Sequence, residues 1–255
     1  MGSAADEDIL YGLHPVLEAQ RAGRRHFREI LVAAKKPGRN LREVLRKAEA
    51  QHIPITRKTR EKLEALTGTR AHQGVAARVS PFAAVPCSEL FASLSGRDMF
   101  LFLDGIKDPQ NLGALIRTAL CTGTRGAVIA KSRQAAPTPA VSKASAGALE
   151  HMPLARVANL VQAMKDLKKS GGWIIGLDAK AGKSIYETDF KGPAAIVVGA
   201  EEAGIRPLVR RECDFLAHIP MAASGVGSLN ASAAGAVVLY EAFRQQGTPG
   251  APEKR

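Results

Sequence analysis

From residue 99 onward, short apolar runs alternate with helical patterns, and this alternation limits the fold more than any other feature. The run MFLFL at 99–103 is continuously apolar, which is typical of a strand buried on both faces of a sheet. Comparable short runs are predicted as strands at 126–130, 152–157, 173–177, 194–198 and 215–219. The segments 111–122, 137–150, 158–170 and 207–213 have helical patterns. Alternating strands and helices predict an α/β domain whose parallel sheet is covered on both faces.

The first 79 residues predict a separate, smaller α/β domain. Helical patterns begin near residue 13 and at 39–51 and 60–66, and short strands are expected at 29–32, 53–55 and 74–79. The segment 80–97 (SPFAAVPCSELFASLSGR) has two prolines and several small residues, which favour a linker. We therefore expect domains at 9–79 and 98–246, with a disordered leader at 1–8 and a disordered tail at 247–255.

The chain is strongly basic, with a formal net charge of +12. Such an excess suggests a polyanionic partner, most simply nucleic acid, although a merely basic surface is the alternative. Of the 36 basic residues, 16 lie in the first 80 positions, which makes the N-terminal domain the expected RNA-binding part. The candidates for contact with an RNA backbone are Arg21, Arg24, Arg25, Arg28, Lys35, Lys36, Arg39, Arg57, Lys58 and Arg60.

Cysteine and histidine usage argues against several classes of protein. Cys87, Cys121 and Cys213 are far apart and odd in number, which disfavours a disulfide framework and indicates a reducing, cytoplasmic location. The histidines show no metal-ligand spacing, so no metal is expected. No apolar run approaches the roughly 18 residues of a membrane span, and the polar start MGSAADED is unlike a signal peptide, so no membrane partner is expected.

The stretch from Phe215 to Glu241 predicts a strand, a loop and a helix. Pro220 ends the strand because it has no backbone donor for the sheet, and residues 221–227 are small and loop-like. Ser228 is the expected N-cap of the following helix, with Asn230 close behind. A helix N-terminus suits an anion or a developing oxyanion, although a plain capping role for both residues is the alternative.

Two further stretches of the sequence disfavour a plain capping role for Ser228 and Asn230. They are DPQNLGALIRTA at 108–119 and IVVGAEEAGI at 196–205. Together with residues 219–241 of the stretch above, they resemble the three signature motifs of the SPOUT superfamily, in its TrmH/SpoU branch of RNA ribose 2′-O-methyltransferases. The segment HQGVAA at 72–77 resembles the end of the L30e-like, RNA-binding domain that precedes the SPOUT domain in this branch. The resemblance covers about residues 9–246 and is closest to members that methylate a guanosine of large-subunit ribosomal RNA.

The resemblance implies a trefoil-knotted parallel sheet, a homodimer and a cofactor, S-adenosyl-L-methionine. By this resemblance the cofactor would be held by the loops at Gly199, Ala200, Ile219, Pro220, Met221 and Leu229. At Gly199, the missing side chain would let a ligand approach the backbone, and plain turn geometry is the alternative explanation.

The motif positions also imply the catalytic residues, which are Asn111, Arg117, Glu201, Ser228 and Asn230. A guanidinium scarcely loses its proton in proteins, so Arg117 is expected to grip the target phosphate and polarise the 2′-hydroxyl. Glu201 is expected to orient Arg117 or Asn111, or to help accept the proton. Asn111 and Arg117 are six residues apart, which places them on different faces of one helix, with Asn111 at its start.

Other interpretations stay open. Glu202 stands where the family usually has glycine, and the loop 221–227 is one residue longer than in close relatives, so the target choice could differ. A transfer-RNA or antibiotic-resistance methyltransferase of the same branch is one alternative. A non-catalytic RNA-binding protein with the same fold is another, although all five polar motif residues are present. The chain has no GxGxxG after its first apolar strand, which argues against a dinucleotide-dependent oxidoreductase.

Overall fold

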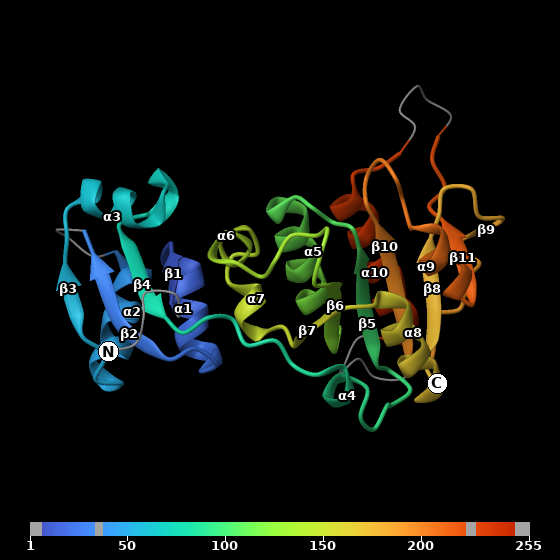
Figure 1. Ribbon diagram of the computed structural model, residues 1–255, viewed down its shortest axis with the longest axis horizontal. Helices are drawn as coiled ribbons and strands as arrows, with labels where there is room; N and C mark the ends of the chain where they lie inside the picture. Colours follow the sequence, from blue (N-terminus) through green and yellow to red (C-terminus); the bar gives the residue numbers. More distant parts are fainter. Residues whose placement is uncertain (1–6, 34–37, 223–227, 248–255) are drawn as a thin grey trace. The chain divides into compact units, whose positions relative to one another are not determined.

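A computed structural model describes residues 7–33, 38–222 and 228–247 (Figure 1). The chain divides into two compact units, which are described separately. Unit 1 comprises Met1–Ala83 together with Ala136–His151, and unit 2 comprises Ala84–Ala135 together with Met152–Arg255. The segment 136–151, which we expected in the C-terminal domain, therefore packs as part of the N-terminal unit.

Unit 1 contains a four-stranded mixed sheet with the order β1-β4-β2-β3. Its central strand β4 is antiparallel to both neighbours, whereas β2 and β3 are parallel. The strands are β1 (Asp8–Tyr11), β2 (Phe27–Val32), β3 (Ile55–Arg57) and β4 (Val75–Val79). The helices are α1 (Leu13–Ala22), α2 (Arg39–Ala50), α3 (Arg60–Thr67), the short 3-10 turn η1 (Arg70–His72), α6 (Pro139–Ala144) and α7 (Ala148–His151). The strand expected at 53–55 instead begins at Ile55, and Asp8, expected in the leader, opens β1.

A buried ion pair holds α7 within unit 1. Arg25 donates from Nε to Glu150 Oε2 at 2.8 Å, and both side chains are 1% exposed. The same guanidinium contacts Asp8 at 2.7 Å and the Ser80 carbonyl at 2.8 Å, and it lies 5.2 Å from the ring centre of Phe82. A buried charge must be paired and hydrogen-bonded, and these contacts satisfy that need. The expectation that Arg25 is exposed to RNA is therefore wrong.

The other basic candidates of the N-terminal part differ in exposure. Lys58 is half-buried, and Lys35 and Lys36 lie outside the described residues. The exposed ones are Arg21, Arg24, Arg28, Arg39, Arg57 and Arg60.

Unit 2 is a seven-stranded sheet in which every neighbouring pair is parallel, as the alternation of strands and helices predicts. The strand order is β7-β6-β5-β10-β8-β11-β9. The strands are β5 (Met99–Asp104), β6 (Gly126–Ala130), β7 (Leu154–Val157), β8 (Trp173–Leu177), β9 (Lys183–Ser184), β10 (Ala194–Gly199) and β11 (Phe215–His218). The two-residue edge strand β9 has no hydrophobic pattern of its own and was not expected.

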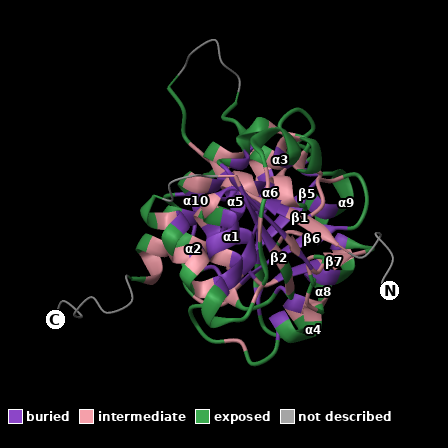
Figure 2. Ribbon diagram, turned by 90° about the vertical axis from the view of Figure 1, so that its left-hand side faces the viewer, coloured by how far each residue is buried: buried purple, intermediate pink, exposed green. Residues whose placement is uncertain are grey.

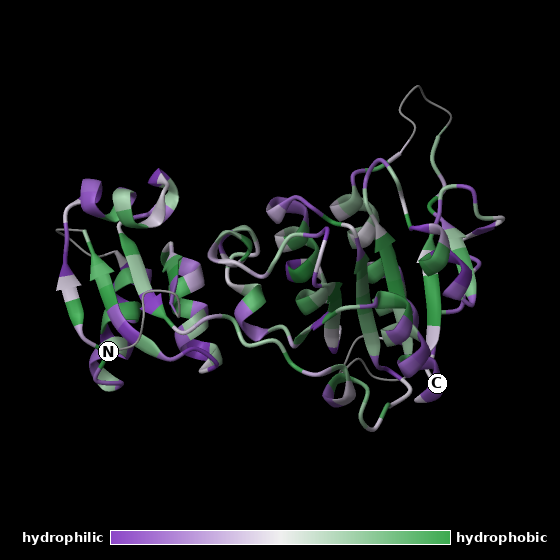
Figure 3. Cartoon of the chain, viewed as in Figure 1, coloured by the Kyte–Doolittle hydropathy of each residue, from purple (hydrophilic) through white to green (hydrophobic). Residues whose placement is uncertain are grey.

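Helices lie on both faces of this sheet, and the central strands are the most hydrophobic part of the unit (Figure 3). These helices are α4 (Cys87–Leu90), α5 (Pro109–Cys121), α8 (Leu160–Lys169), α9 (Pro207–Glu212) and α10 (Ala231–Gln246). On one face, Phe100, Phe102 and Val197 pack with residues of α8 and α9. On the other face α5 and α10 are in contact, and a side chain at Gly235 would lie 2.2 Å from Leu115 Cδ2. A larger residue at 235 would therefore displace the side chain of Leu115 from this helix contact.

The three cysteines differ in how far they are buried (Figure 2 shows burial along the chain). All three are free thiols, and Cys121 is exposed. Burial raises the pKa of Cys87 to about 11 and that of Cys213 to about 12.

Within residues 7–33, 38–222 and 228–247, no helix is long and apolar enough to cross a membrane, and no cluster of acidic, His and Cys side chains could hold a metal ion.

Glu150→Ala is expected to lower the unfolding free energy by about 3–5 kcal/mol, because it leaves the buried Arg25 without its main partner. A urea titration of the full chain measures this loss. Glu64→Ala is the control, since its partner Arg70 is 89% exposed in its side chain and the pair is screened by water. A Glu150→Ala transition that coincides with that of Glu64→Ala would contradict the structural role of the pair.

Candidate functional site

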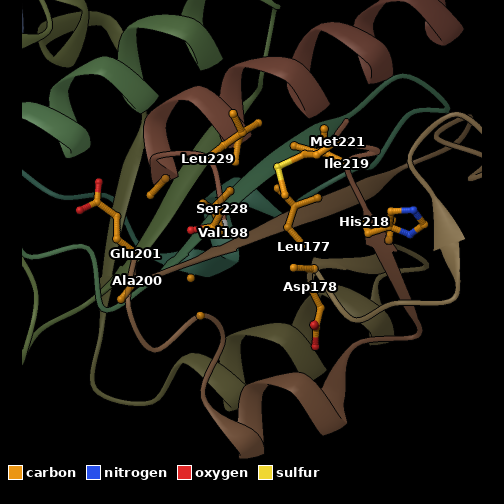
Figure 4. Close-up of a pocket in the computed structure, with 16 residues that line it drawn as sticks. Leu177, Asp178, Val198, Ala200, Glu201, His218, Ile219, Met221, Ser228 and Leu229 are labelled. Carbon is orange, nitrogen blue, oxygen red and sulfur yellow. The ribbon is translucent and has the colours of Figure 1, made fainter. Parts of the chain in front are cut away.

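A cavity opens at the carboxyl ends of β8, β10 and β11, next to the start of α10 (Figure 4). In parallel sheets, ligands commonly bind at this edge, where the loops after neighbouring strands meet. The walls are mainly apolar, with a carboxylate on either side. The lining residues are Leu177, Asp178, Ala179, Val198, Gly199, Ala200, Glu201, Gly204, Ala217, His218, Ile219, Met221, Ser228, Leu229, Ala231 and Ala234.

Most residues expected to hold a cofactor lie in this cavity. Gly199, Ala200, Ile219, Met221 and Leu229 line it, whereas Pro220 does not. The expected set missed the end of β8, where Leu177, Asp178 and Ala179 contribute to the wall. A signal for these three was present, because the strand 173–177 was predicted and its carboxyl end must lie at the same edge of a parallel sheet.

Of the two explanations for Gly199, the structure favours turn geometry. A side chain at this position would lie 2.1 Å from the backbone carbon of Gly204 and 2.4 Å from the nitrogen of Ile205. The chain thus folds back against Gly199 itself, and Ala200 and Gly204 exchange two backbone hydrogen bonds of 3.1 and 2.8 Å. The loop after β10, and not a ligand, is what excludes a side chain here, so turn geometry explains the glycine.

Asp178 is a charged group at the cavity wall. Its Oδ2 accepts a hydrogen bond from Arg210 Nε at 2.5 Å, and its Oδ1 accepts one from the backbone N–H of Lys180 at 2.8 Å. Burial raises the pKa of Asp178, but the hydrogen bonds from Lys180 and Arg210 outweigh that effect and lower the pKa below its ordinary value. Asp178 is therefore an ionised hydrogen-bond acceptor at neutral pH.

Three of the five predicted catalytic residues form one hydrogen-bonded cluster beside the cavity. Glu201 Oε1 accepts a hydrogen bond from Asn111 Nδ2 at 2.8 Å and another from Asn230 Nδ2. Asn230 Nδ2 also lies 3.1 Å from Asn111 Oδ1. The cluster therefore joins the first turn of α5, the loop after β10 and the start of α10. Both amide contacts use the same carboxylate oxygen, which leaves Oε2 of Glu201 for another donor.

Helix capping explains why the two amides reach this point. Asp108 caps α5 by accepting from the backbone N–H of Gln110 at 2.9 Å, and this places Asn111 in the first turn, as expected. Asn230 caps α10, with its Oδ1 accepting from the backbone N–H groups of Ser232 and Ala233. The expectation that Ser228 is the N-cap is therefore wrong. Ser228 instead lines the cavity, two residues before the cap.

Arg117 does not join the cluster. It lies nearly two turns along α5 from Asn111, it is exposed, and none of the hydrogen bonds and ion pairs among the described residues involves it. The six-residue spacing thus separates the two side chains on the helix, as predicted. Because no described residue accepts a hydrogen bond from Arg117, the five donors of its guanidinium are available to a bound ligand.

Comparison with family models covers both parts of the chain. Residues 98–240 match the SpoU rRNA Methylase family, and residues 9–85 match the family described as RNA 2′-O ribose methyltransferase substrate binding. The first match includes Asn111, Arg117, Glu201, Ser228 and Asn230. The second includes most of β1 and all of β2, β3 and β4.

Similar proteins agree with these matches. The chain is 38% identical over 239 residues to the 23S rRNA (guanosine-2′-O-)-methyltransferase RlmB of Ralstonia nicotianae, covering 93% of this chain and 96% of the relative. It is 36% identical to the putative TrmH family tRNA/rRNA methyltransferase YacO of Bacillus subtilis, covering 95% and 98%. Among solved structures, the SpoU methyltransferase AviRb of Streptomyces viridochromogenes in complex with the cofactor AdoMet has a TM-score of 0.80 at 26% identity, covering 94% of this chain and 91% of that one.

Asn230→Ala is expected to lower the unfolding free energy by about 1 kcal/mol, because it removes the N-cap of α10. Asn230→Ser keeps a capping oxygen while losing the contacts to Asn111 and Glu201, so it should be nearly as stable as the parent. Urea titrations of both variants distinguish the two roles of this side chain. Equal losses in the Ala and Ser variants would contradict the importance of the cap.

Proposed function

The chain belongs to the SpoU rRNA methylase family and is an S-adenosylmethionine-dependent RNA ribose 2′-O-methyltransferase, and we propose that its target is a guanosine of large-subunit ribosomal RNA. The guanosine target follows the name of the Ralstonia nicotianae relative, which matches this chain over both domains. Such a substrate also implies a cytoplasmic enzyme. The name of the Bacillus subtilis relative includes transfer RNA, which is the alternative substrate.

One observation supports a working catalytic site above all others, namely the meeting of Asn111, Glu201 and Asn230 at the cavity. These residues come from three motifs that are about 90 and 30 residues apart in the sequence. A binding protein that had lost catalysis would have no need to keep a carboxylate held by two amides at a helix start. The cluster thus disfavours the non-catalytic alternative.

The cavity suits the nucleoside part of S-adenosylmethionine. Leu177, Val198, Ile219 and Leu229 provide apolar walls of the kind that adenine requires. At the end of β8, the ionised Asp178 can accept hydrogen bonds from ribose hydroxyls. The loops after β8, β10 and β11 that build these walls are also the ones that the expected trefoil knot would bring together. When bound, the cofactor supplies the activated methyl group.

Methyl transfer requires an attacking 2′-oxygen that is correctly placed and has lost its proton. Glu201 Oε2 is the acceptor we assign to that proton, because Oε1 is already fixed by Asn111 and Asn230. Arg117 is assigned to the target phosphate, since its planar fork of donors matches phosphate oxygens and scarcely loses a proton. Ser228 lines the cavity wall, and we assign it to hold the target ribose.

An exposed apolar stripe on α10 supports the homodimer. Ala233, Val237 and Tyr240 follow one another at helical spacing on the solvent side of this helix, and Tyr240 is 53% exposed. On the neighbouring helix α5, Arg117 and Cys121 are also exposed. Large exposed apolar patches on a helix surface mark interaction sites, and a second copy of the chain would cover this one. Arg117 would then lie beside an interface.

Arg117→Ala is expected to reduce methyl transfer to unmodified large-subunit ribosomal RNA at least about 100-fold, because the target phosphate and hydroxyl lose their cationic donor. Affinity for S-adenosylmethionine, measured by calorimetry, should stay within about twofold. Arg117→Lys keeps the charge without the planar fork and should recover only part of the rate. Loss of cofactor binding in the folded Ala variant would contradict the assigned role.

Tyr240→Glu combined with Val237→Glu is expected to convert a dimer into a monomer, because two carboxylates would be buried in an apolar interface. Sedimentation velocity at micromolar concentration measures the change. Tyr186→Glu is the control, since Tyr186 is 61% exposed but lies outside α10. A parent protein that sediments as a monomer would contradict the homodimer.

A further inference from the structure

Unit 2 contains a second cavity that the methyl-transfer site does not use. It has a volume of about 410 Å³ and lies beyond the carboxyl ends of β6 and β7, between the starts of α8 and α9. Its walls include Ser132, Asn159, Val161, Arg206, Pro207 and Leu208. The volume is within the range of small-molecule sites, which is roughly 300–1,000 Å³. The cavity is thus large enough for a flat, partly apolar group.

The walls combine apolar surface with a few polar groups. Leu208 lies at the cavity rim and is 67% exposed, which is the highest value among the large hydrophobic residues that the structure describes. Val161 and Pro207 continue the apolar wall. Asn159 caps α8 through Oδ1, which accepts from the backbone N–H of Gln162, so its Nδ2 is left to donate to a ligand. An apolar slot with a fixed amide at one end is suited to a nucleobase.

Positive charge surrounds this slot. Arg206 is oriented by the buried Asp104, which it contacts through Nε and Nη2 at 2.6 Å, so Nη1 is available for another acceptor. Lys131 and Arg133 flank Ser132 in the loop after β6, and both are exposed. Because Asp104 neutralises much of Arg206, the two flanking residues supply most of the net charge. Such a rim favours an anionic ligand.

A single loop separates the second cavity from the methyl-transfer site. Ala200, Glu201 and Gly204 line the first cavity, and Arg206 lines the second, so the loop after β10 has one site on each side. The backbone bonds between Ala200 and Gly204, and the contact of Arg206 with Asp104, hold this loop in place. A strand of RNA with its target ribose at Glu201 would need to cross only this loop to reach the second cavity.

We propose that the second cavity binds the base of an unpaired nucleotide that flanks the methylated one in the RNA substrate. The base would lie against Leu208 and Pro207, with its edge toward Asn159, and its phosphates would face Lys131, Arg133 and Arg206. An unpaired nucleotide is specified because a base inside an RNA helix offers neither its faces nor its pairing edge. The inference rests on the proposed action on RNA, and it identifies a specificity site for that reaction.

Asn159→Asp is the sharpest test, because aspartate caps a helix as well as asparagine and adds a negative charge where the RNA would lie. Its affinity for unmodified, transcribed large-subunit ribosomal RNA should fall about tenfold in filter binding near 0.1 M salt. Thermal stability and the Kd for S-adenosylmethionine should not change. Leu208→Ser should weaken RNA binding similarly, and Leu208→Phe should retain it, because a phenyl ring still covers a base.

Ser170→Asp is the matched control, since it adds the same charge at the other end of α8, about 16 Å away. That distance exceeds the screening length of about 10 Å at 0.1 M salt, so this variant should bind RNA like the parent. Parental RNA affinity in both Asn159→Asp and Leu208→Ser would overturn the proposal. The binding assay needs no chemistry, so a parent protein that binds RNA without methylating it would refute the proposed function and still test this cavity.

Discussion

The carboxylate of Glu201 is the interaction on which the site depends. One of its oxygens accepts hydrogen bonds from Asn111, in the first turn of α5, and from Asn230, at the cap of α10. These contacts bring together the three motifs around the carboxyl edge of the parallel sheet. The loop that carries Glu201 can turn back only because residue 199 is glycine, which the backbone of Gly204 approaches closely. The geometry of the proposed proton acceptor is therefore set by backbone packing and by two helix starts.

The loop after β10 also lies between the proposed methyl-transfer site and the proposed base-binding cavity. Its first half lines the cofactor cavity, and Arg206 at its end reaches the second cavity while paired with the buried Asp104. In unit 1, by contrast, the basic residues that were candidates for RNA contact divide into structural and exposed groups. Arg25 stabilises the packing of α7 through Glu150, whereas Arg24, Arg28 and Arg39 are exposed.

Much of the fold could be predicted because hydrophobic patterns report burial. The runs at 99–103 and 194–198 are buried on both faces and form neighbouring central strands, as expected of a parallel sheet. Patterns could not reveal pairings between distant segments. The grouping of 136–151 with unit 1 depends on Arg25 and Glu150, which are 125 positions apart. Similarly, Ser228 and Asn230 are equally good caps by residue type, and only the backbone path selects Asn230.

The proposed reaction is transfer of a methyl group to a ribose 2′-hydroxyl of large-subunit ribosomal RNA. The most direct measurement is transfer from labelled S-adenosylmethionine to unmodified total ribosomal RNA and transfer RNA, with the modified nucleosides identified by mass spectrometry. We expect label in 2′-O-methylguanosine from large-subunit RNA. Label confined to transfer RNA would contradict the proposed substrate, and no label despite binding of both the cofactor and RNA would contradict the reaction itself.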